Sequence, residues 1–216
     1  MQPELKCDIL IVGAGTGGCA AAIAACREGR RVIMTEPCEW IGGQLTSQAV
    51  PPDENKWIEM HGGTLTYQRF RSGVRNYYKS HYPLNADARV NDHLNPGTGF
   101  VSRICHEPKV AHAVLREMLS AYESQGLLRI LRYVEPDGAD TDGEQIRSVS
   151  FRSLRDEPGF TVTAPFVLDA TELGDLLPLT DTEFVVGAES QAETGENLAP
   201  SQADPGNVQA ITWVFA

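Results

Sequence analysis

Residues 8–29, DILIVGAGTGGCAAAIAACREG, decide the fold, because an apolar run, a glycine cluster and an alanine-rich segment follow one another directly. The apolar run Cys7–Val12 predicts a parallel strand that is buried on both faces. Residues Gly18–Glu28 predict a helix that Gly29 closes. Arg31–Glu36 predicts a second strand, so the segment reads as a β-α-β unit with a right-handed crossover.

The glycine cluster has the spacing Gly-x-Gly-x-x-Gly and lies between the predicted strand and the predicted helix. In this pattern Gly13 permits a tight turn, Gly15 lets the backbone approach a diphosphate, and Gly18 lets the helix pack close to the sheet. Unpaired amides at the helix N-terminus favour an anion there. The predicted diphosphate site therefore comprises Gly13, Ala14, Gly15, Thr16, Gly17 and Gly18.

An acidic residue, Glu36, ends the second predicted strand, about 20 residues after the glycines. Its carboxylate can accept hydrogen bonds from both hydroxyls of an adenosine ribose, and it would repel a 2′-phosphate. The expected ligand is therefore FAD or NAD, and NADP is disfavoured.

The composition and hydrophobic periodicity of the remaining chain change twice. Residues Pro51–His106 carry scattered aromatics, glycines and prolines without sustained periodicity, and we expect an irregular or inserted cap there. Order returns with a helix that begins at Pro108, shows one apolar face and ends at Gly126. Three β-like runs separated by turn-rich stretches then predict a meander, and another strand precedes Thr171: Leu128–Val134, Ile146–Phe151, Phe160–Ala164 and Phe166–Ala170.

Composition indicates an ordinary globular protein of 216 residues, with 42% apolar residues and a net charge of −11. Without a Lys/Arg run, a nucleic-acid surface or a polybasic membrane patch is disfavoured, and a small-molecule substrate is the expected partner. Five cysteines without Cys-x-x-Cys spacing favour a reducing, cytoplasmic compartment, and we assign no metal site.

Three features together resemble the FAD-dependent oxidoreductase family within the glutathione-reductase-like FAD-binding superfamily. They are the opening DILIVGAGTGGCAAAIAA, the pair Gly42-Gly43, and the segment DATELGDL from Asp169 to Leu176. The last feature departs from the usual Ala-Thr-Gly signature, because Glu172 stands where glycine is common. The resemblance covers roughly residues 7–50 and 105–180.

The resemblance implies FAD as the cofactor and assigns further contacts beyond the glycine cluster. Gly42, Gly43 and Gln44 would lie on the ribityl and flavin side, and Val134 would contact adenine through its backbone. Ala170 and Thr171 would lie near the diphosphate. A later segment of the family that completes the flavin site has no counterpart here, and the strand-like ending Ala210–Ala216 suggests an incomplete chain.

The expected fold class is α/β, a Rossmann-like FAD-binding domain with a mostly parallel sheet, a crossover β-meander and an inserted cap. Residues 1–50 and 105–180 would form the FAD-binding domain, and 51–104 and 181–216 a partial cap or substrate region. The expected function is FAD-dependent oxidation or reduction of an unidentified small molecule with an unknown electron acceptor. The alternatives are a non-catalytic dinucleotide-binding fragment and an NAD-dependent dehydrogenase.

No residue is assigned as catalytic, because a flavin carries the redox chemistry and needs at most one proton donor from the protein. The candidates for proton transfer or anion binding all lie in the cap-like region: His61, His81, His93, Arg103 and His106. A pocket there could be lined by the aromatics Trp57, Tyr67, Tyr77, Tyr78 and Tyr82. Cys38 has no second cysteine nearby, which disfavours a dithiol mechanism.

Overall fold

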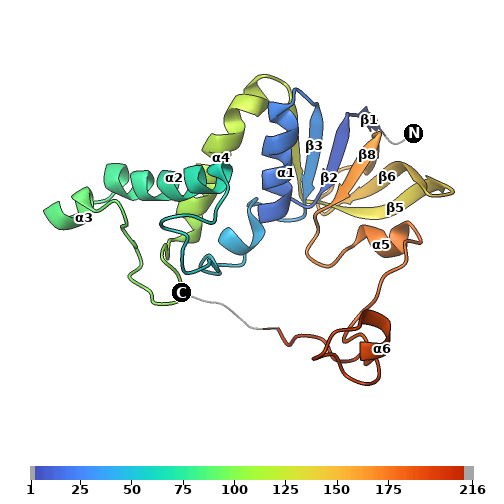
Figure 1. Cartoon of the computed structure of the whole chain (residues 1–216). Helices are drawn as coiled ribbons and strands as arrows, with labels where there is room; N and C mark the ends of the chain where they lie inside the picture. The colour runs from blue at the N-terminus through green and yellow to red at the C-terminus, as the bar shows by residue number, and fades with distance from the viewer. Residues whose placement is uncertain (1–2, 212–216) are drawn as a thin grey trace.

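The computed structural model describes residues 3–211, and the described chain folds into two four-stranded sheets with helices beside them (Figure 1). The first sheet is parallel, in the order β4-β3-β2-β8. Its elements, with the helix that connects β2 to β3, are β2 (Ile9–Val12), α1 (Thr16–Arg27), β3 (Val32–Glu36), β4 (Leu128–Arg132) and β8 (Phe166–Asp169). The predicted β-α-β unit and the mostly parallel sheet are confirmed.

Helix α1 and helix α4 (Pro108–Ser124) cover one face of the parallel sheet, and the second sheet covers the other. Alternating side chains of β2 divide between these layers, because successive residues of a strand point to opposite faces. Ile11 packs with both helices, whereas Leu10 and Val12 pack with the second sheet. The parallel sheet is therefore buried on both faces, as its apolar sequence predicts.

The second sheet has the order β1-β7-β6-β5, with antiparallel β5-β6 and β6-β7 pairs. Its strands are β1 (Glu4–Lys6), β5 (Val134–Asp142), β6 (Gln145–Ser153) and β7 (Phe160–Thr163). The meander is confirmed, although the expected membership of its strands is wrong. The run expected as its first strand belongs to β4 in the parallel sheet, and β5 occupies a stretch expected to hold a turn.

Tyr133 explains that difference. It is the single residue between β4 and β5, and its φ of 60° lies in the left-handed region that non-glycine residues rarely adopt. The strand therefore ends within a β-like run that contains no glycine or proline. Asp137-Gly138 lies at a register shift within the β5-β6 pair, whereas Asp142 pairs with Gln145 at the hairpin end.

The cap-like region is more regular than the sequence predicts. It contains α2 (Leu65–His81), which packs on α4, and the short helix α3 (Ala86–Val90). The buried face of α2 includes Arg71 and Arg75 together with three apolar or aromatic residues, so hydrophobicity alone does not reveal the period of this helix. The expectation of an irregular segment over Pro51–His106 is corrected accordingly.

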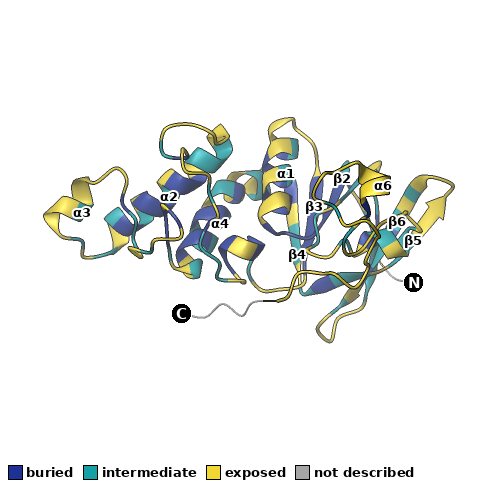
Figure 2. Ribbon diagram, turned by 60° about the horizontal axis from the view of Figure 1, so that its bottom comes forward, coloured by how far each residue is buried: buried dark blue, intermediate teal, exposed yellow. Residues whose placement is uncertain are grey.

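The described C-terminal part contains two one-turn helices, α5 (Leu176–Leu179) and α6 (Gln191–Thr194). Buried residues concentrate in α1, α2, α4 and the sheets, whereas α3 and α6 are partly or fully exposed throughout (Figure 2). The strand expected at Ala210–Ala216 lies, except for its first two residues, outside the described range. Within residues 3–211 no helix is long and apolar enough to cross a membrane.

Candidate dinucleotide-binding site

The glycine turn joins β2 to α1 at the carboxyl edge of the parallel sheet. Gly13 has a φ of +96°, and a Cβ there would stand 2.3 Å from the carbonyl oxygen of Ala170, just beyond β8. A Cβ on Gly18 would stand 2.1 Å from the carbonyl oxygen of Gly13. These two glycines let the turn lie against its neighbours, in the roles that the sequence predicts.

The N-terminus of α1 opens into a cavity of about 280 Å³. Gly15 occupies the N-cap position without a side-chain cap, and the first turn contains no acidic residue. An α-helix carries about half a positive charge at this end. The cavity is lined by Gly15, Thr16, Gly17, Gln44, Ala170, Thr171 and Glu172.

Glu36 lies beside the same turn and is 6% exposed. Its Oε2 accepts a hydrogen bond from the backbone N–H of Ala14 at 3.1 Å, and its Oε1 accepts one from the N–H of Cys38 at 3.0 Å. Burial raises the pKa of Glu36, the amides of Cys38 and Ala14 oppose that shift, and the charge of Glu172 adds to it. The carboxyl group therefore faces the glycine turn, and its pKa is higher than usual.

The pair Gly42-Gly43 packs directly on the glycine turn, at the start of the 3₁₀ helix η1 (Gly43–Leu45). The N–H of Gly42 donates to the carbonyl oxygen of Ala14 at 2.7 Å, and its own carbonyl oxygen accepts from Thr16 Oγ1 at 3.1 Å. A Cβ on Gly43 would stand 3.0 Å from the Cα of Gly15. Two segments that the sequence singles out separately thus form one backbone surface.

The end of β8 forms the other wall of the cavity, and Asp169 organises it. Its Oδ1 accepts from the N–H and the hydroxyl of Thr171 at 3.0 and 2.7 Å, and its Oδ2 accepts from the N–H of Leu176 at 3.0 Å. The Thr171 hydroxyl oxygen also accepts from the N–H of Asp175 at 2.8 Å. Sequence reasoning missed Asp169, although an acid at the end of an apolar strand was the available signal.

Val134 stands apart from the cavity but lies at the same edge of the sheet. It begins β5, is 7% exposed and packs in the core between the two sheets. Two residues earlier, Arg132 is the parallel-sheet partner of Glu36. The structure thus places Val134 near the ribose-binding candidate and separate from the glycine turn.

The candidate proton-transfer residues are dispersed over the cap. His93 Nδ1 lies 2.8 Å from Glu59 Oε2 and lines a 520 Å³ cavity together with Arg103. His106 packs edge-on against Phe70, and burial lowers its pKa. The other two candidates lie against aromatic rings, His61 beside Trp57 and His81 on Tyr77.

Cys38 is the exposed thiol among five free cysteines, all within the described residues. Burial and the nearby Glu36 raise the pKa of this thiol, which reduces its thiolate fraction.

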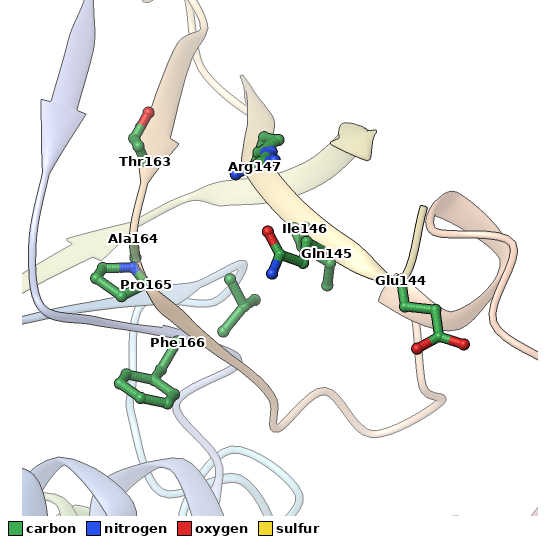
Figure 3. A pocket seen from close by; sticks show the side chains of 9 residues that line it. Glu144, Gln145, Ile146, Arg147, Thr163, Ala164, Pro165 and Phe166 are labelled. Carbon is green, nitrogen blue, oxygen red and sulfur yellow. The ribbon is translucent and has the colours of Figure 1, made fainter. Parts of the chain in front are cut away.

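A larger cavity, of about 630 Å³, lies between the start of β6 and the β7–β8 connection (Figure 3). Thr163 to Phe166 form one wall, and Glu144 to Arg147 form the other. Its cationic residue, Arg147, is already paired with Asp142 at 2.5 Å. None of the predicted cofactor-binding residues lines it, so the smaller cavity at the glycine turn is the better candidate site.

Residues 8–214 match the family described as FAD dependent oxidoreductase. The chain belongs to this family. FAD is the cofactor that the family uses, and the resemblance inferred from the glycine motifs is confirmed.

This member of the FAD-dependent oxidoreductase family matches only part of the length of its curated relatives. The chain is 28% identical over 124 residues to a soluble pyridine nucleotide transhydrogenase of Sodalis glossinidius, covering 57% of this chain and 23% of that protein. It is 32% identical over 89 residues to an L-amino acid dehydrogenase of Synechocystis, covering 40% and 18%. The chain thus spans less than a quarter of the length of each of these relatives.

Among solved structures, Thermovibrio ammonificans THI4 is similar at 14% identity and a TM-score of 0.47, covering 92% of this chain and 76% of that one.

The residues at the turn fit the family's cofactor. Gly17 lines the cavity, and a Cβ there would meet nothing within 4 Å, so no neighbouring atom crowds the first turn of α1 at this residue. The uncapped helix end suits a diphosphate, and the Glu36 carboxylate next to Ala14 suits the hydroxyls of the adjoining ribose.

Proposed function

We propose that this protein binds FAD at the N-terminus of α1 and oxidises or reduces a small-molecule substrate. The observation that carries the proposal is the convergence of the glycine turn, the Gly42-Gly43 pair and Glu36 at one edge of the parallel sheet. Gly13, Gly15, Thr16, Gly17 and Gly18 would hold the diphosphate. When bound, FAD supplies the hydride or electron transfer.

The other residues orient the two ends of the cofactor. Glu36 would bind the adenosine ribose, and the backbone of Val134 would contact adenine. Gly42, Gly43 and Gln44 would lie on the flavin side, with Ala170 and Thr171 near the diphosphate. We also propose that residues 51–104 and 181–216 contribute to the substrate region, with a small-molecule substrate and a separate electron acceptor as partners.

The test is FAD binding by the purified chain, followed by visible absorbance and by calorimetry. The expected result is a yellow complex whose absorbance bleaches when the flavin is reduced under anaerobic conditions. Glu36→Gln should weaken binding of FAD about ten-fold or more, because a buried charge-assisted acceptor for two hydroxyls is lost. Glu28→Gln removes the same charge from the exposed C-terminal end of α1 and should leave the affinity unchanged.

Two outcomes would favour the alternatives. A colourless complex with NAD, and no binding of FAD, would support an NAD-dependent dehydrogenase. Binding of ADP and FAD with no reduction by any donor would support a dinucleotide-binding fragment without turnover.

A further inference from the structure

Glu172 places a carboxylate against the glycine turn, at the position where the superfamily's Ala-Thr-Gly signature has glycine. Its Oε1 would stand 2.9 Å from a Cβ on Gly15 and 2.7 Å from a Cβ on Gly43. The side chain therefore reaches across the cavity from the β8 side, into space that exists because both facing residues lack a side chain. It shares this cavity with Thr16 and Gly17 of α1.

The carboxylate is near the helix end but is not fixed there. Glu172 is exposed, and no hydrogen bond to another described residue holds its side chain. The negative charge also acts at a distance, since it contributes to the raised pKa of Glu36 on the far side of the turn. A ligand phosphate at the N-terminus of α1 would thus bind close to a charge of its own sign.

This repulsion depends on how much charge the ligand phosphate carries. A diphosphate that joins two nucleoside halves, as in FAD or ADP-ribose, has one negative charge on each phosphate. The free terminal phosphate of ADP carries nearly a second charge above its pKa of about 6. Because the Coulomb energy scales with the product of the charges, Glu172 disfavours the free terminal phosphate more strongly.

We propose that Glu172 is a specificity-determining residue that selects diphosphate diesters over nucleoside diphosphates with a free terminal phosphate. The proposal rests on the proposed function, because it requires that a diphosphate bind at the α1 N-terminus. The uncapped helix end attracts both kinds of ligand, and the carboxylate on the opposite wall separates them by charge. The chain would thereby retain dinucleotides in the presence of free ADP.

The experiment measures the dissociation constants of ADP and ADP-ribose by calorimetry at pH 7.5 and low salt, for the wild type and for Glu172→Gln. The wild type should bind ADP-ribose more tightly than ADP. In Glu172→Gln the ratio of the two constants should fall by about ten-fold, mainly through tighter binding of ADP. Tighter binding of ADP itself is the decisive observation, because weaker binding of ADP-ribose alone would also lower the ratio and would instead show a contact between Glu172 and the extra ribose.

Glu183→Gln provides the matched control, because Glu183 is an exposed acid farther along the same segment. This variant should leave the ratio unchanged. Added salt should also shrink the difference between wild type and Glu172→Gln, since the charges are solvent-accessible and screened.

An unchanged ratio in Glu172→Gln would overturn the proposal, and so would weaker binding of both ligands, which would make Glu172 a ligand contact. Failure of every variant to bind either ligand, with normal unfolding transitions, would instead refute the diphosphate site itself. The proposed function would then fail together with this inference.

Discussion

Two adjacent glycines of α1 offer a sharp test of how closely the helix packs on the turn. We consider Gly18→Ala and, as its control, Gly17→Ala. A Cβ on Gly18 would stand 2.1 Å from the carbonyl oxygen of Gly13, whereas a Cβ on Gly17 would meet nothing within 4 Å. Neither residue has a positive φ, so backbone strain does not enter the comparison.

The magnitude follows from the difference between the two variants. Replacing glycine by alanine in a helix stabilises it by about 0.5–1 kcal/mol, and this gain is common to both positions. Real Cβ contacts stay beyond 3.0 Å, so Gly18→Ala forces α1 and the Gly13 turn apart by about 1 Å. Overpacking of this kind costs about 1–3 kcal/mol, and here both sides are backbone, which favours the upper end.

The assay is urea unfolding of both variants and the wild type without ligand. We expect Gly17→Ala to equal or exceed the wild type in free energy of unfolding. Gly18→Ala should lie about 1–3 kcal/mol below Gly17→Ala. Equal stabilities of the two variants would refute the reasoning, because the helix would then not need the close approach that the structure shows.

Two further predictions concern the cap and the surface. Burial alone would raise the pKa of Glu59, but hydrogen bonds from Arg71, Arg75 and His93 hold it well below its usual range. Glu59→Gln should lower the free energy of unfolding by about 3 kcal/mol at pH 7. The loss should shrink as pH falls below the ordinary carboxyl pKa, because the wild-type contribution is full above that value and declines progressively as pH falls from there through the depressed native pKa. Unfolding at pH 7 and pH 3 checks this, and an equal loss at both would contradict it. Native thiol labelling should modify Cys38 first, at a rate that keeps rising with pH past the ordinary thiol pKa because the pKa of Cys38 is raised, and Cys38→Ser should abolish this fast phase.

The sequence predicts the β-α-β unit and the glycine turn because both follow from local rules. The apolar run, the glycines and the alanine-rich helix each restrict the backbone without help from distant residues. Glu36 was equally accessible to sequence reasoning, since its position at the end of the second strand brings it to the edge where the turn lies. The hydrogen bond from Ala14 to Glu36 agrees with that placement.

Other features depend on contacts between distant segments. The period of α2 is hidden because Arg71 is 2% exposed and paired with Glu54 and Glu59, so a charged residue takes a core position. The reach of Glu172 toward Gly15 depends on the three-dimensional approach of β8 to the turn, which no local pattern specifies. Assignment of Leu128–Val134 to one sheet failed because Tyr133 gives no sequence signal for its left-handed backbone.

Tyr133 also has a consequence for the way in which the molecule opens. Its carbonyl oxygen accepts from the N–H of Leu154 at 2.7 Å, and Arg155 stacks on its ring. With a single residue between β4 and β5, neither sheet can detach without displacing the edge strand of the other. Amide protons of the meander and of the parallel sheet should therefore exchange with solvent in one cooperative event, at a common opening free energy.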